Sequence, residues 1–467
     1  MQRKILISLM TGLGLFSAAT APAVAQSAPA ADRLEQIAQQ LQELKDANER
    51  LQAEVEYLKA NAKAARKDAA DQTVKVDTLA STAGVAASKY TWSGDFRMRR
   101  ELIDAEENVG RARDRIRVRF GVLAKVNDRI NAKLQFSTTN TGNDTARSTN
   151  QTLGTTFDRK PLSIDLAYVD WKATDTLNLV LGKMPIPWTT TVSYLFDKDI
   201  TPEGAALKWV RGPLFGGVYY MDLNERDAGA LSATSSAAST DANMFVAQLG
   251  IKQQVGKLTW TGALGYFDVN NVKDRIASGA VPAGGTSCAI DGAFGAGQGT
   301  GNNAFGNRLY AGAGPAVGSA ALCNRLLSDF NEIEAFGQVD FLIGKHPFSA
   351  FVDYMKNNGV SSSVSTKQDT ALAAGFLLNQ ASAAKTWEIG AIYQKAEKDS
   401  QFGQFIDSDF GGGVTDTKGY VVKAAYVPLA NWTLNATYFI NDRFIDNSDT
   451  APTKTYKRLQ LDLNYKY

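Results

Sequence analysis

Arginines occupy every second position in part of the stretch RARDRIRVRFGVLAKV, residues 111–126. A helix would scatter these side chains around its circumference, whereas a β-strand places residues two apart on one face. The alternate positions from Ile116 to Val126 are apolar. The stretch therefore predicts a strand with one apolar and one strongly cationic face. The cationic face is formed by Arg113, Arg115, Arg117 and Arg119.

A row of guanidinium groups can bind anions or create an electric field, but like charges side by side repel one another. This face must therefore contact abundant water or anions. A second cationic face is expected in YTWSGDFRMRREL, residues 90–102, where Arg97 and Arg99 alternate with Phe96 and Met98. The solvated outer face of a soluble sheet is the alternative, although such a face normally mixes charges of both signs.

Residues suited to catalysis are few. His346 is the only histidine, and the sequence Gly344–Pro347 around it predicts a turn. A barrel hydrolase would need its histidine base near the lipid or the exterior, so we expect no enzymatic activity. The glycine run 295–301 lacks the Lys-Ser/Thr of a phosphate loop, and Asp407 and Asp409 lack the downstream glutamate of a calcium loop. We therefore expect neither a metal nor a cofactor.

Two cysteines, Cys288 and Cys323, lie in the same long predicted loop. Exported proteins meet an oxidising compartment, and a disulfide there would restrict an otherwise flexible segment. The prediction is a disulfide between them, and two free thiols are the alternative.

The 467 residues suffice for about two or three ordinary domains or for one large barrel. Residues 1–25 combine a basic start, an apolar core and the small-residue site Ala23-Val24-Ala25, which predicts a secretory signal peptide. Its removal takes away Arg3 and Lys4 and leaves 48 basic and 48 acidic residues. Nucleic acid is not an expected partner, because its phosphates require a net basic surface.

A heptad pattern follows the predicted signal peptide. Its a and d positions are Leu34, Ile37, Leu41, Leu44, Asn48, Leu51, Val55 and Leu58. The pattern predicts an oligomeric coiled coil whose register is fixed by the polar Asn48. A lone amphipathic helix on a surface is the alternative, but polar residues on all other faces argue against it. Residues 60–88 lose the leucines and predict a frayed helix or linker.

From Tyr90 onward the hydrophobic pattern has a period of two. Outer-membrane strands show such alternation because one face meets lipid and the other meets the lumen. We predict about sixteen antiparallel strands, an even number as in bacterial single-chain barrels. The predicted strands are residues 90–102, 111–126, 129–139, 161–172, 176–184, 203–210, 214–223, 243–255, 258–269, 331–344, 348–357, 370–380, 386–398, 417–429, 432–444 and 454–467.

The connections between these strands alternate in length. Tight turns such as Asn127-Asp128 alternate with long polar segments at 140–160, 224–242 and 270–330. Short periplasmic turns and long exterior loops are typical of outer-membrane barrels. The final strand, 454–467, must pair with the first, because an open sheet edge cannot persist in lipid.

The predicted fold is thus an all-β transmembrane barrel of about sixteen antiparallel strands, preceded by an α-helical coiled coil. Residues 1–25 are the signal peptide, 26–88 a periplasmic coiled coil and linker, and 89–467 the barrel in the bacterial outer membrane. Outer-membrane lipid is the expected surrounding of the barrel.

Several blocks of the barrel resemble the bacterial family described as putative porins, whose members often begin with a coiled coil. The blocks are GDFRMRRE (94–101), RDRIRVRFGVLAKVND (113–128), AYVDWKAT (167–174), GKMPIPW (182–188) and TPEGAALKW (201–209). The resemblance implies a porin barrel and transfers no ligand residue. Tyr467 departs from the final Phe of many outer-membrane barrels but keeps the aromatic character.

The segment MPIPWTTTVSYLFDKDITPEG, residues 184–204, resembles in position and length the loop that forms the constriction of trimeric porins. Its acids Asp197, Asp199 and Glu203 would then face the arginines across the pore. Opposed charges create a transverse field that favours polar solutes. Alternatively, the acids pair with the basic wall and brace the loop. Acidic residues on the strand 331–344 make the lumen mixed, so we expect only a slight preference for anions.

The expected function is passive diffusion of small hydrophilic solutes and ions through a water-filled pore. A channel specific for phosphate or organic anions is one alternative, and a structural tether with a plugged barrel is another. The barrel and the coiled coil together predict a homotrimer, and a dimer is the alternative that the heptads alone leave open. The cell wall is a possible contact of the coiled coil.

Overall fold

The structure is a computed structural model of the 467-residue chain. The residues it describes are 35, 37–39, 41–60, 63, 66, 89–139, 146–226, 240–278, 288, 290–294, 303–313, 322–446 and 452–467. The predicted signal peptide and most of the predicted linker lie outside these ranges. The chain divides into two units, Met1–Val85 and Ala86–Tyr467, near the expected boundary between coiled coil and barrel.

The described part of the first unit is helical from residue 41 to residue 60. The apolar side chains at its predicted a and d positions are exposed, from 46% for Val55 to 71% for Leu44. Leu34 lies outside the described residues. Within the described ranges, no helix is long and apolar enough to cross a membrane.

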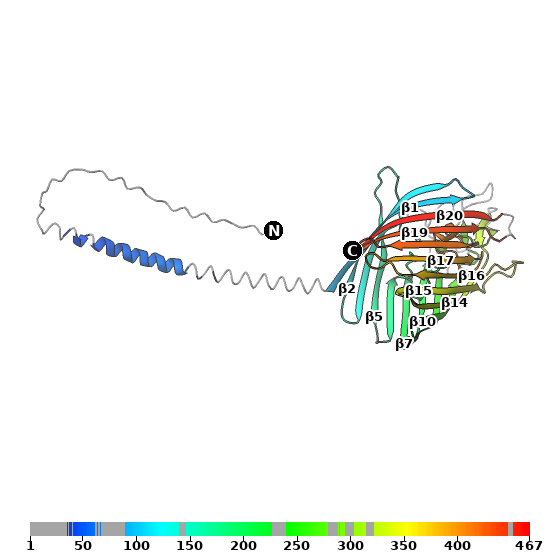
Figure 1. The fold of residues 1–467 in the computed structure, drawn as a ribbon, viewed down its shortest axis with the longest axis horizontal. Coiled ribbons are helices and arrows are strands. Elements are labelled where there is room, and N and C mark those ends of the chain that lie inside the picture. The colour runs from blue at the N-terminus through cyan, green and yellow to red at the C-terminus, as the bar shows by residue number, and fades with distance from the viewer. Residues whose placement is uncertain are drawn as a thin grey trace, which may run out of the picture. The chain divides into compact units, whose positions relative to one another are not determined.

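The second unit is a closed antiparallel β-barrel of sixteen long strands (Figure 1). The sheet has 17 strands when the two-residue β4, Gln151–Thr152, is counted. All sixteen predicted strands are confirmed, with small shifts at their ends. Their bounds are β1 Tyr90–Ala105, β2 Arg111–Lys125, β3 Ile130–Thr138, β5 Leu162–Lys172, β6 Leu177–Lys183, β7 Glu203–Arg211, β8 Leu214–Asn224, β9 Ala242–Val255, β10 Leu258–Asn270, β14 Phe330–Ile343, β15 His346–Asn357, β16 Thr370–Leu378, β17 Trp387–Ala396, β18 Thr417–Tyr426, β19 Trp432–Arg443 and β20 Lys454–Lys466.

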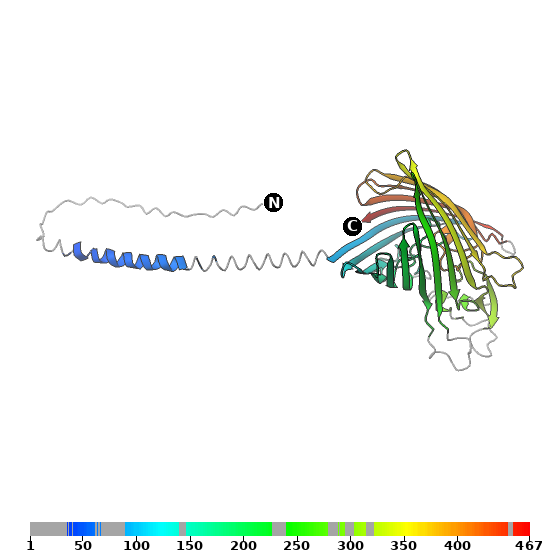
Figure 2. The same cartoon turned by 90° about the horizontal axis from the view of Figure 1, so that it is seen from below.

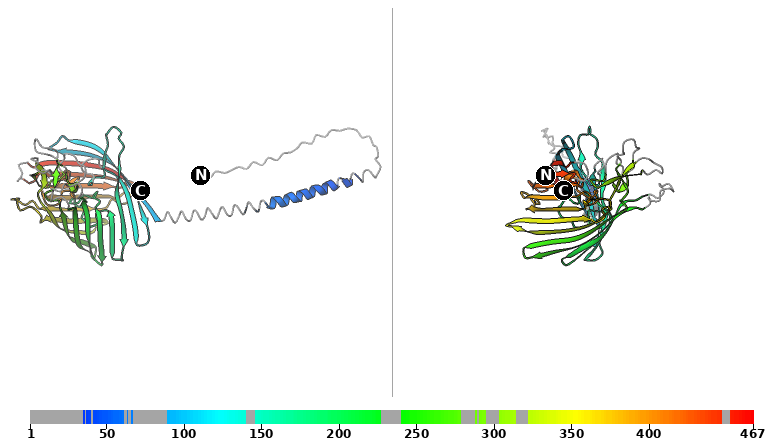
Figure 3. Two further views of the ribbon diagram at one scale, coloured as in Figure 1. Left: turned by 180° about the vertical axis from the view of Figure 1, so that it is seen from behind. Right: turned by 90° about the vertical axis from the view of Figure 1, so that its right-hand side faces the viewer.

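The strands wrap around a lumen (Figures 2 and 3). The burial pattern shows that side chains alternate between the outer wall and this lumen. On β2, Arg115 and Arg117 are 4% and 8% exposed, whereas Phe120 on the opposite face is 45% exposed. Trp92 of β1 stacks on Phe120 with ring centroids 5.2 Å apart. The outer wall is apolar because lipid cannot hydrogen-bond polar groups.

Short and long connections alternate along the barrel, as predicted. At one end the strands are joined by tight turns such as residues 212–213 and 256–257. At the other end are the long loops 184–202, 271–329 and 397–416, which contribute fully buried apolar side chains to a cluster inside the barrel. The interior is thus partly filled by loops that start at one end.

A small second sheet lies in the segment that the sequence predicted to be a long loop. It consists of β11 (Ile276–Ser278), β12 (Leu309–Ala313) and β13 (Leu322–Leu326). These strands are too short to show a clear alternating pattern, so the sequence analysis did not predict them. Cys323 of β13 is joined by a disulfide to Cys288, with Cα atoms 6.0 Å apart.

Barrel closure brings Tyr467 against Gly94 of β1. The backbone N–H of each residue donates to the carbonyl of the other at 3.1 Å. The Tyr467 ring lies over Gly94, and its hydroxyl donates to the carbonyl of Arg119 at 3.1 Å. A Cβ atom at Gly94 would collide with this ring and with the Arg119 carbonyl.

We expect Gly94→Ala to reduce the fraction of closed, heat-modifiable barrel on semi-native gels. Gly337→Ala is the matched control, because a Cβ on this β14 glycine would meet no atom within 4 Å. Equal yields of closed barrel from the two variants would contradict the assigned β1–β20 closure.

Candidate functional site

Loop 184–202 joins β6 to β7 and enters the lumen beside β9 and β10. Trp188 packs edge-on against Phe267 of β10, with ring centroids 5.5 Å apart. The backbone of Thr189 exchanges two hydrogen bonds with the inward-facing side-chain amide of Gln248 on β9, at 2.9 and 2.8 Å. These contacts fix the first part of the loop against one side of the lumen.

The loop then reaches strands on another part of the barrel wall. The hydroxyls of Thr191 and Ser193 donate to Asp353 of β15 at 2.6 and 3.0 Å. The backbone N–H of Tyr194 donates to the side chain of Gln394 on β17 at 2.9 Å. The loop therefore crosses the lumen and is held there by inward-facing polar side chains.

The six arginines singled out from the sequence lie together on the inward faces of β1 and β2. The two strands pair so that Arg97 lies opposite Arg117 and Arg99 opposite Arg115. Each of the six has a carboxylate within 4 Å. This cluster, called the arginine wall below, comprises Arg97, Arg99, Arg113, Arg115, Arg117 and Arg119.

Glu101 of β1 is the fully buried centre of one half of this wall. Its carboxylate pairs with Arg113, lies 2.6 Å from Arg458 of β20, and lies 3.5 and 3.6 Å from Arg99 and Arg115. One carboxylate thus offsets the repulsion among four guanidinium groups, which could not be buried together without it.

Two further acids complete this half. Arg99 forms a two-bond pair with Asp462 of β20, at 2.7 and 2.9 Å, and Arg97 lies 3.8 Å from the same carboxylate. Asp409, from the long connection before β18, lies 3.3 Å from Arg99 and 2.7 Å from Arg458. Charge-assisted pairs of this kind are among the stronger protein hydrogen bonds.

Asp199 is the predicted loop acid that contacts the arginine wall. Its carboxylate lies 2.7 Å from Arg119 and 3.9 Å from Arg117. Thr149 donates to it through its backbone N–H and its hydroxyl, at 3.3 and 3.1 Å. Arg117 also pairs with Asp95 at 2.7 Å. The contact ties the end of loop 184–202 to β2, which is the bracing arrangement considered as an alternative.

The other two predicted loop acids do not face the arginine wall, which corrects that expectation. Asp197 is buried and accepts hydrogen bonds from the backbone N–H groups of Asp199 and Ser408, at 2.8 and 2.7 Å. Glu203 is the first residue of β7, is exposed, and pairs with Lys183 of β6 at 2.8 Å. Backbone hydrogen bonding draws Asp197 away, and strand alternation directs Glu203 to the outer side.

Two backbone hydrogen bonds join loops 184–202 and 397–416, and this contact is called the clasp below. The N–H of Asp197 donates to the carbonyl of Phe405 at 2.8 Å, and the N–H of Asp407 to that of Tyr194 at 3.3 Å. Burial, together with the nearby Asp409 carboxylate, raises the pKa of Asp407 to about 7. Burial and the charge of Asp407 likewise raise the pKa of Asp197. The clasp is therefore most favourable when these carboxyl groups hold protons.

Among the acids of the wall that sequence reasoning missed are Glu101, Asp462 and Asp409. Glu101 shares its strand face with Arg97 and Arg99, and Asp462 alternates with leucines in the last strand, so face parity and barrel closure together could have placed both. Asp409 had no such signal, because it reaches the wall from a loop.

An acidic patch lies on another part of the inner wall. Glu332 and Glu334 of β14 and Asp353 of β15 are all fully buried. Glu332 accepts a hydrogen bond from the backbone N–H of Phe402 at 2.7 Å, so this patch also holds loop 397–416. The lumen carries both signs of charge, in separate regions.

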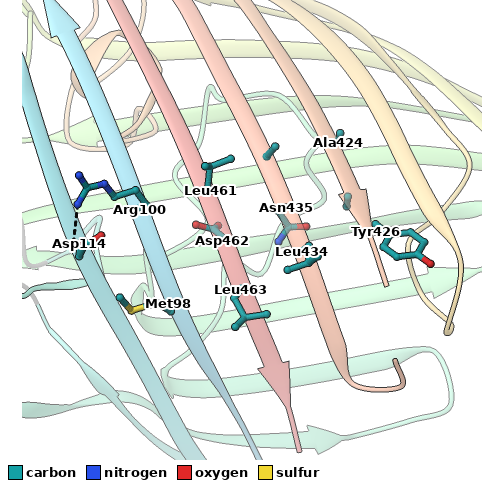
Figure 4. A pocket seen from close by; sticks show the side chains of 12 residues that line it. Met98, Arg100, Asp114, Ala424, Tyr426, Leu434, Asn435, Leu461, Asp462 and Leu463 are labelled. Atoms are coloured by element: carbon teal, nitrogen blue, oxygen red, sulfur yellow. Dashed lines mark hydrogen bonds and ion pairs between the residues drawn. The ribbon is translucent and has the colours of Figure 1, made fainter. Parts of the chain in front are cut away.

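One apolar hollow lies on the outer wall, over β1, β18, β19 and β20 (Figure 4). Small residues, Ala424 and Ala436, line it together with Leu461. At its edge Arg100 of β1 pairs with Asp114 of β2 at 2.7 Å, and their side chains are 48% and 40% exposed. An arginine on a lipid-facing wall costs about 2–4 kcal/mol near the bilayer midplane, so a second contact surface is expected here.

An apolar outer wall around a charged lumen makes the second unit a transmembrane β-barrel. The chain matches the family described as Putative porin over residues 59–467. It belongs to that porin family, as the sequence blocks indicated. The comparison with curated proteins finds no match.

The chain is similar to several solved structures at low sequence identity. The high-pH structure of Pseudomonas putida OprB is 10% identical, with a TM-score of 0.50, and the match covers 84% of this chain and 97% of that one. OmpT of Vibrio cholerae, in its trimer form, is 11% identical, with a TM-score of 0.41 and coverage of 81% and 99%. Salmonella typhi OmpF, in complex with daunomycin, is 10% identical, with a TM-score of 0.44 and coverage of 81% and 97%.

The ion pair between Arg119 and Asp199 is testable by a double-mutant cycle. We expect Arg119→Gln and Asp199→Asn each to lower the free energy of unfolding by about 1–3 kcal/mol, and the double variant to lose little more. The control is Arg129→Gln with Asp175→Asn, an exposed pair 3.7 Å apart whose cycle should give less than about 1 kcal/mol. If the losses of unfolding free energy at Arg119 and Asp199 were additive, they would contradict an interaction between the two side chains.

The clasp between the two loops should depend on pH. Because the pKa of Asp407 rises from 3.8 to about 7 on folding, its favourable protonated state is present at low pH and is lost as pH rises through 7. Thermal stability of the wild type should therefore fall between about pH 5 and pH 8. Asp407→Asn keeps the oxygen that accepts from the backbone N–H groups of Asp409 and Phe410, and it should reduce this dependence.

The control for this pH series is Asp128→Asn in an exposed turn, where Lys125 lowers the pKa and moves any titration below the tested range. A wild-type curve that rises between pH 5 and pH 8, or one that Asp407→Asn leaves unchanged, would argue against the protonated clasp.

Proposed function

We propose that this protein is an outer-membrane porin through which small hydrophilic solutes and ions diffuse passively, with a slight preference for anions. The observation that carries the proposal is the crossing of a polar lumen by loop 184–202. Such a loop narrows the passage while its polar contacts keep the remaining surface suited to water. Membership of the porin family supports the same function.

The slight anion preference follows from the charge balance of the arginine wall. Counting Arg458, seven guanidinium groups meet six carboxylates, those of Asp95, Glu101, Asp165, Asp199, Asp409 and Asp462. Most of the positive charge is thus compensated within the wall itself. The small surplus supports a weak preference rather than strict anion selectivity.

Reversal potentials in planar bilayers test this function directly. In asymmetric KCl the purified protein should form open channels whose reversal potential indicates a mild preference for chloride. The preference should shrink in molar salt, where the Debye length falls to about 3 Å. Channels that prefer potassium would contradict the anion preference, and the absence of any conductance would contradict the porin function.

A structural tether with a plugged barrel is the second candidate. It is favoured by the fully buried apolar side chains that the loops place inside the barrel, among them Leu195, Phe294 and Phe402. Liposome swelling separates the two functions, because a plugged barrel admits no sugar. Swelling in small sugars is the result we expect.

We further propose that the protein assembles as a homotrimer, with the helix in the periplasm and in reach of the cell wall. The exposed apolar stripe from Ile37 to Leu58 supports contacts between copies, because a coiled coil would bury it. The Arg100–Asp114 pair and the alanine-lined hollow support a contact between barrels, since a neighbouring copy would shield these charges from lipid.

A deletion and a double substitution test this assembly. Removing residues 32–59 should leave a folded barrel whose oligomer dissociates at a lower temperature on native gels. Arg100→Leu with Asp114→Leu should weaken the oligomer, whereas the same change at the exposed pair Arg129 and Asp175 should not. Unchanged oligomers in both the deletion and the Arg100–Asp114 variant would contradict the proposed contacts.

A further inference from the structure

A cavity of about 500 Å³ lies in the lumen between loop 184–202 and the end of the barrel that carries the tight turns. Pro187 and Thr189 of the loop line one side, and the turn residues Gly212 and Pro213 line the other. Sites for small molecules typically have volumes of about 300–1,000 Å³. A solute leaving the loop region toward this end of the barrel would pass through this space.

Of the four aromatic residues that line the cavity, Phe215 and Tyr219 of β8 and Phe336 of β14 give it an apolar wall on the lumen face, and Trp209 of β7 is the fourth. The end of the Phe215 ring lies against Gly250, and the hydroxyl end of Tyr219 lies against Gly217. Any side chain at these glycines would occupy the space that the rings now fill. The rings therefore lie along the barrel wall and leave the cavity open.

The same cavity holds two lysines, Lys208 of β7 and Lys252 of β9. Within the described part of the chain, neither forms an ion pair, in contrast to the compensated arginine wall. The carboxylate of Asp340 accepts from the Gln338 amide at 2.9 and 3.1 Å and is not a lining group. Uncompensated ammonium groups beside an apolar wall attract an anion, because the wall reduces dielectric screening.

We infer that this cavity binds small ring-bearing carboxylates, with the ring against Phe215, Tyr219 and Phe336 and the carboxylate at Lys208 and Lys252. The inference rests on the proposed porin function and adds a class of preferred solute to it. The hydroxyls of Thr189 and Thr261 offer further hydrogen bonds at the cavity surface, but they do not distinguish acids from sugars. The combination of free lysines with aromatic rings is what favours a ring that carries a carboxylate.

Three probes separate the contributions of ring and charge. Benzoate carries both features, acetate carries only the carboxylate, and benzyl alcohol carries only the ring. Saturation-transfer NMR on the full-length protein in detergent measures binding of each probe without requiring conduction. Benzoate should bind most tightly, and its affinity should fall in molar salt because the lysine charges are screened.

Substitutions should also separate the contribution of the ring from that of the charge. Lys208→Gln with Lys252→Gln should weaken benzoate binding by about tenfold or more and leave benzyl alcohol unaffected. Phe215→Leu keeps an apolar side chain but removes the flat ring, so it should weaken benzoate and leave acetate unaffected. Lys345→Gln, in an exposed turn outside the cavity, removes one positive charge and should change neither.

Single-channel recording completes the test. Benzoate should interrupt the current of the wild type at lower concentration than acetate, and the double lysine variant should lose this difference. Benzoate binding that is absent, or equal in the wild type and the double lysine variant, would overturn the inference while open channels still support a porin. A barrel that binds benzoate but never conducts would instead overturn the porin function and leave the binding site intact.

Discussion

The pairing of β1 with β20 is the constraint on which the rest of this structure depends. A strand edge exposed to lipid would leave backbone groups without hydrogen bonds, at a cost of several kcal/mol for each group. Closure removes that edge, and at Gly94 it brings Tyr467 so near that no side chain fits. Once the sheet is closed, every strand has a lipid side and a lumen side. The period-two pattern along the chain follows from this single requirement.

The closed wall also determines how charge is arranged inside. Arginines that face the same way on two paired strands would repel one another strongly, and the structure offsets this with acids from several parts of the chain. Glu101 comes from the same strand, Asp462 from the strand that closes the barrel, and Asp199 and Asp409 from loops. The same ion pairs that neutralise the wall therefore also fix the loops. Ion selectivity and the fixing of the loops depend on the same residues. A substitution that changes the selectivity is therefore also expected to loosen the loops.

The barrel was predictable from the sequence because local alternation and global fold agree there. Strand positions, their number, and the inward direction of Arg115 and Arg117 all follow from face parity. Loop positions did not follow, because they depend on contacts with distant strands. Asp197 turns toward the backbone of Ser408, and Glu203 already belongs to β7, so only Asp199 of the three loop acids meets the arginines. The strands β11 to β13 were missed because they are too short for a periodic signal.

In the proposed porin, loop 184–202 lies across the lumen and leaves a conducting passage beside it. The most direct measurement combines Ser193→Cys with Asp353→Cys in a chain whose own cysteines are replaced by serine. In the native chain the Ser193 hydroxyl donates to the Asp353 carboxylate, with the two oxygen atoms 3.0 Å apart. Single-channel conductance is then recorded before and after reduction of the new disulfide. The bridge should form spontaneously, and conductance should be the same in both states, because the bridge holds the loop where it already lies. Failure to form the bridge, or channels that open widely only after reduction, would contradict this position of the loop.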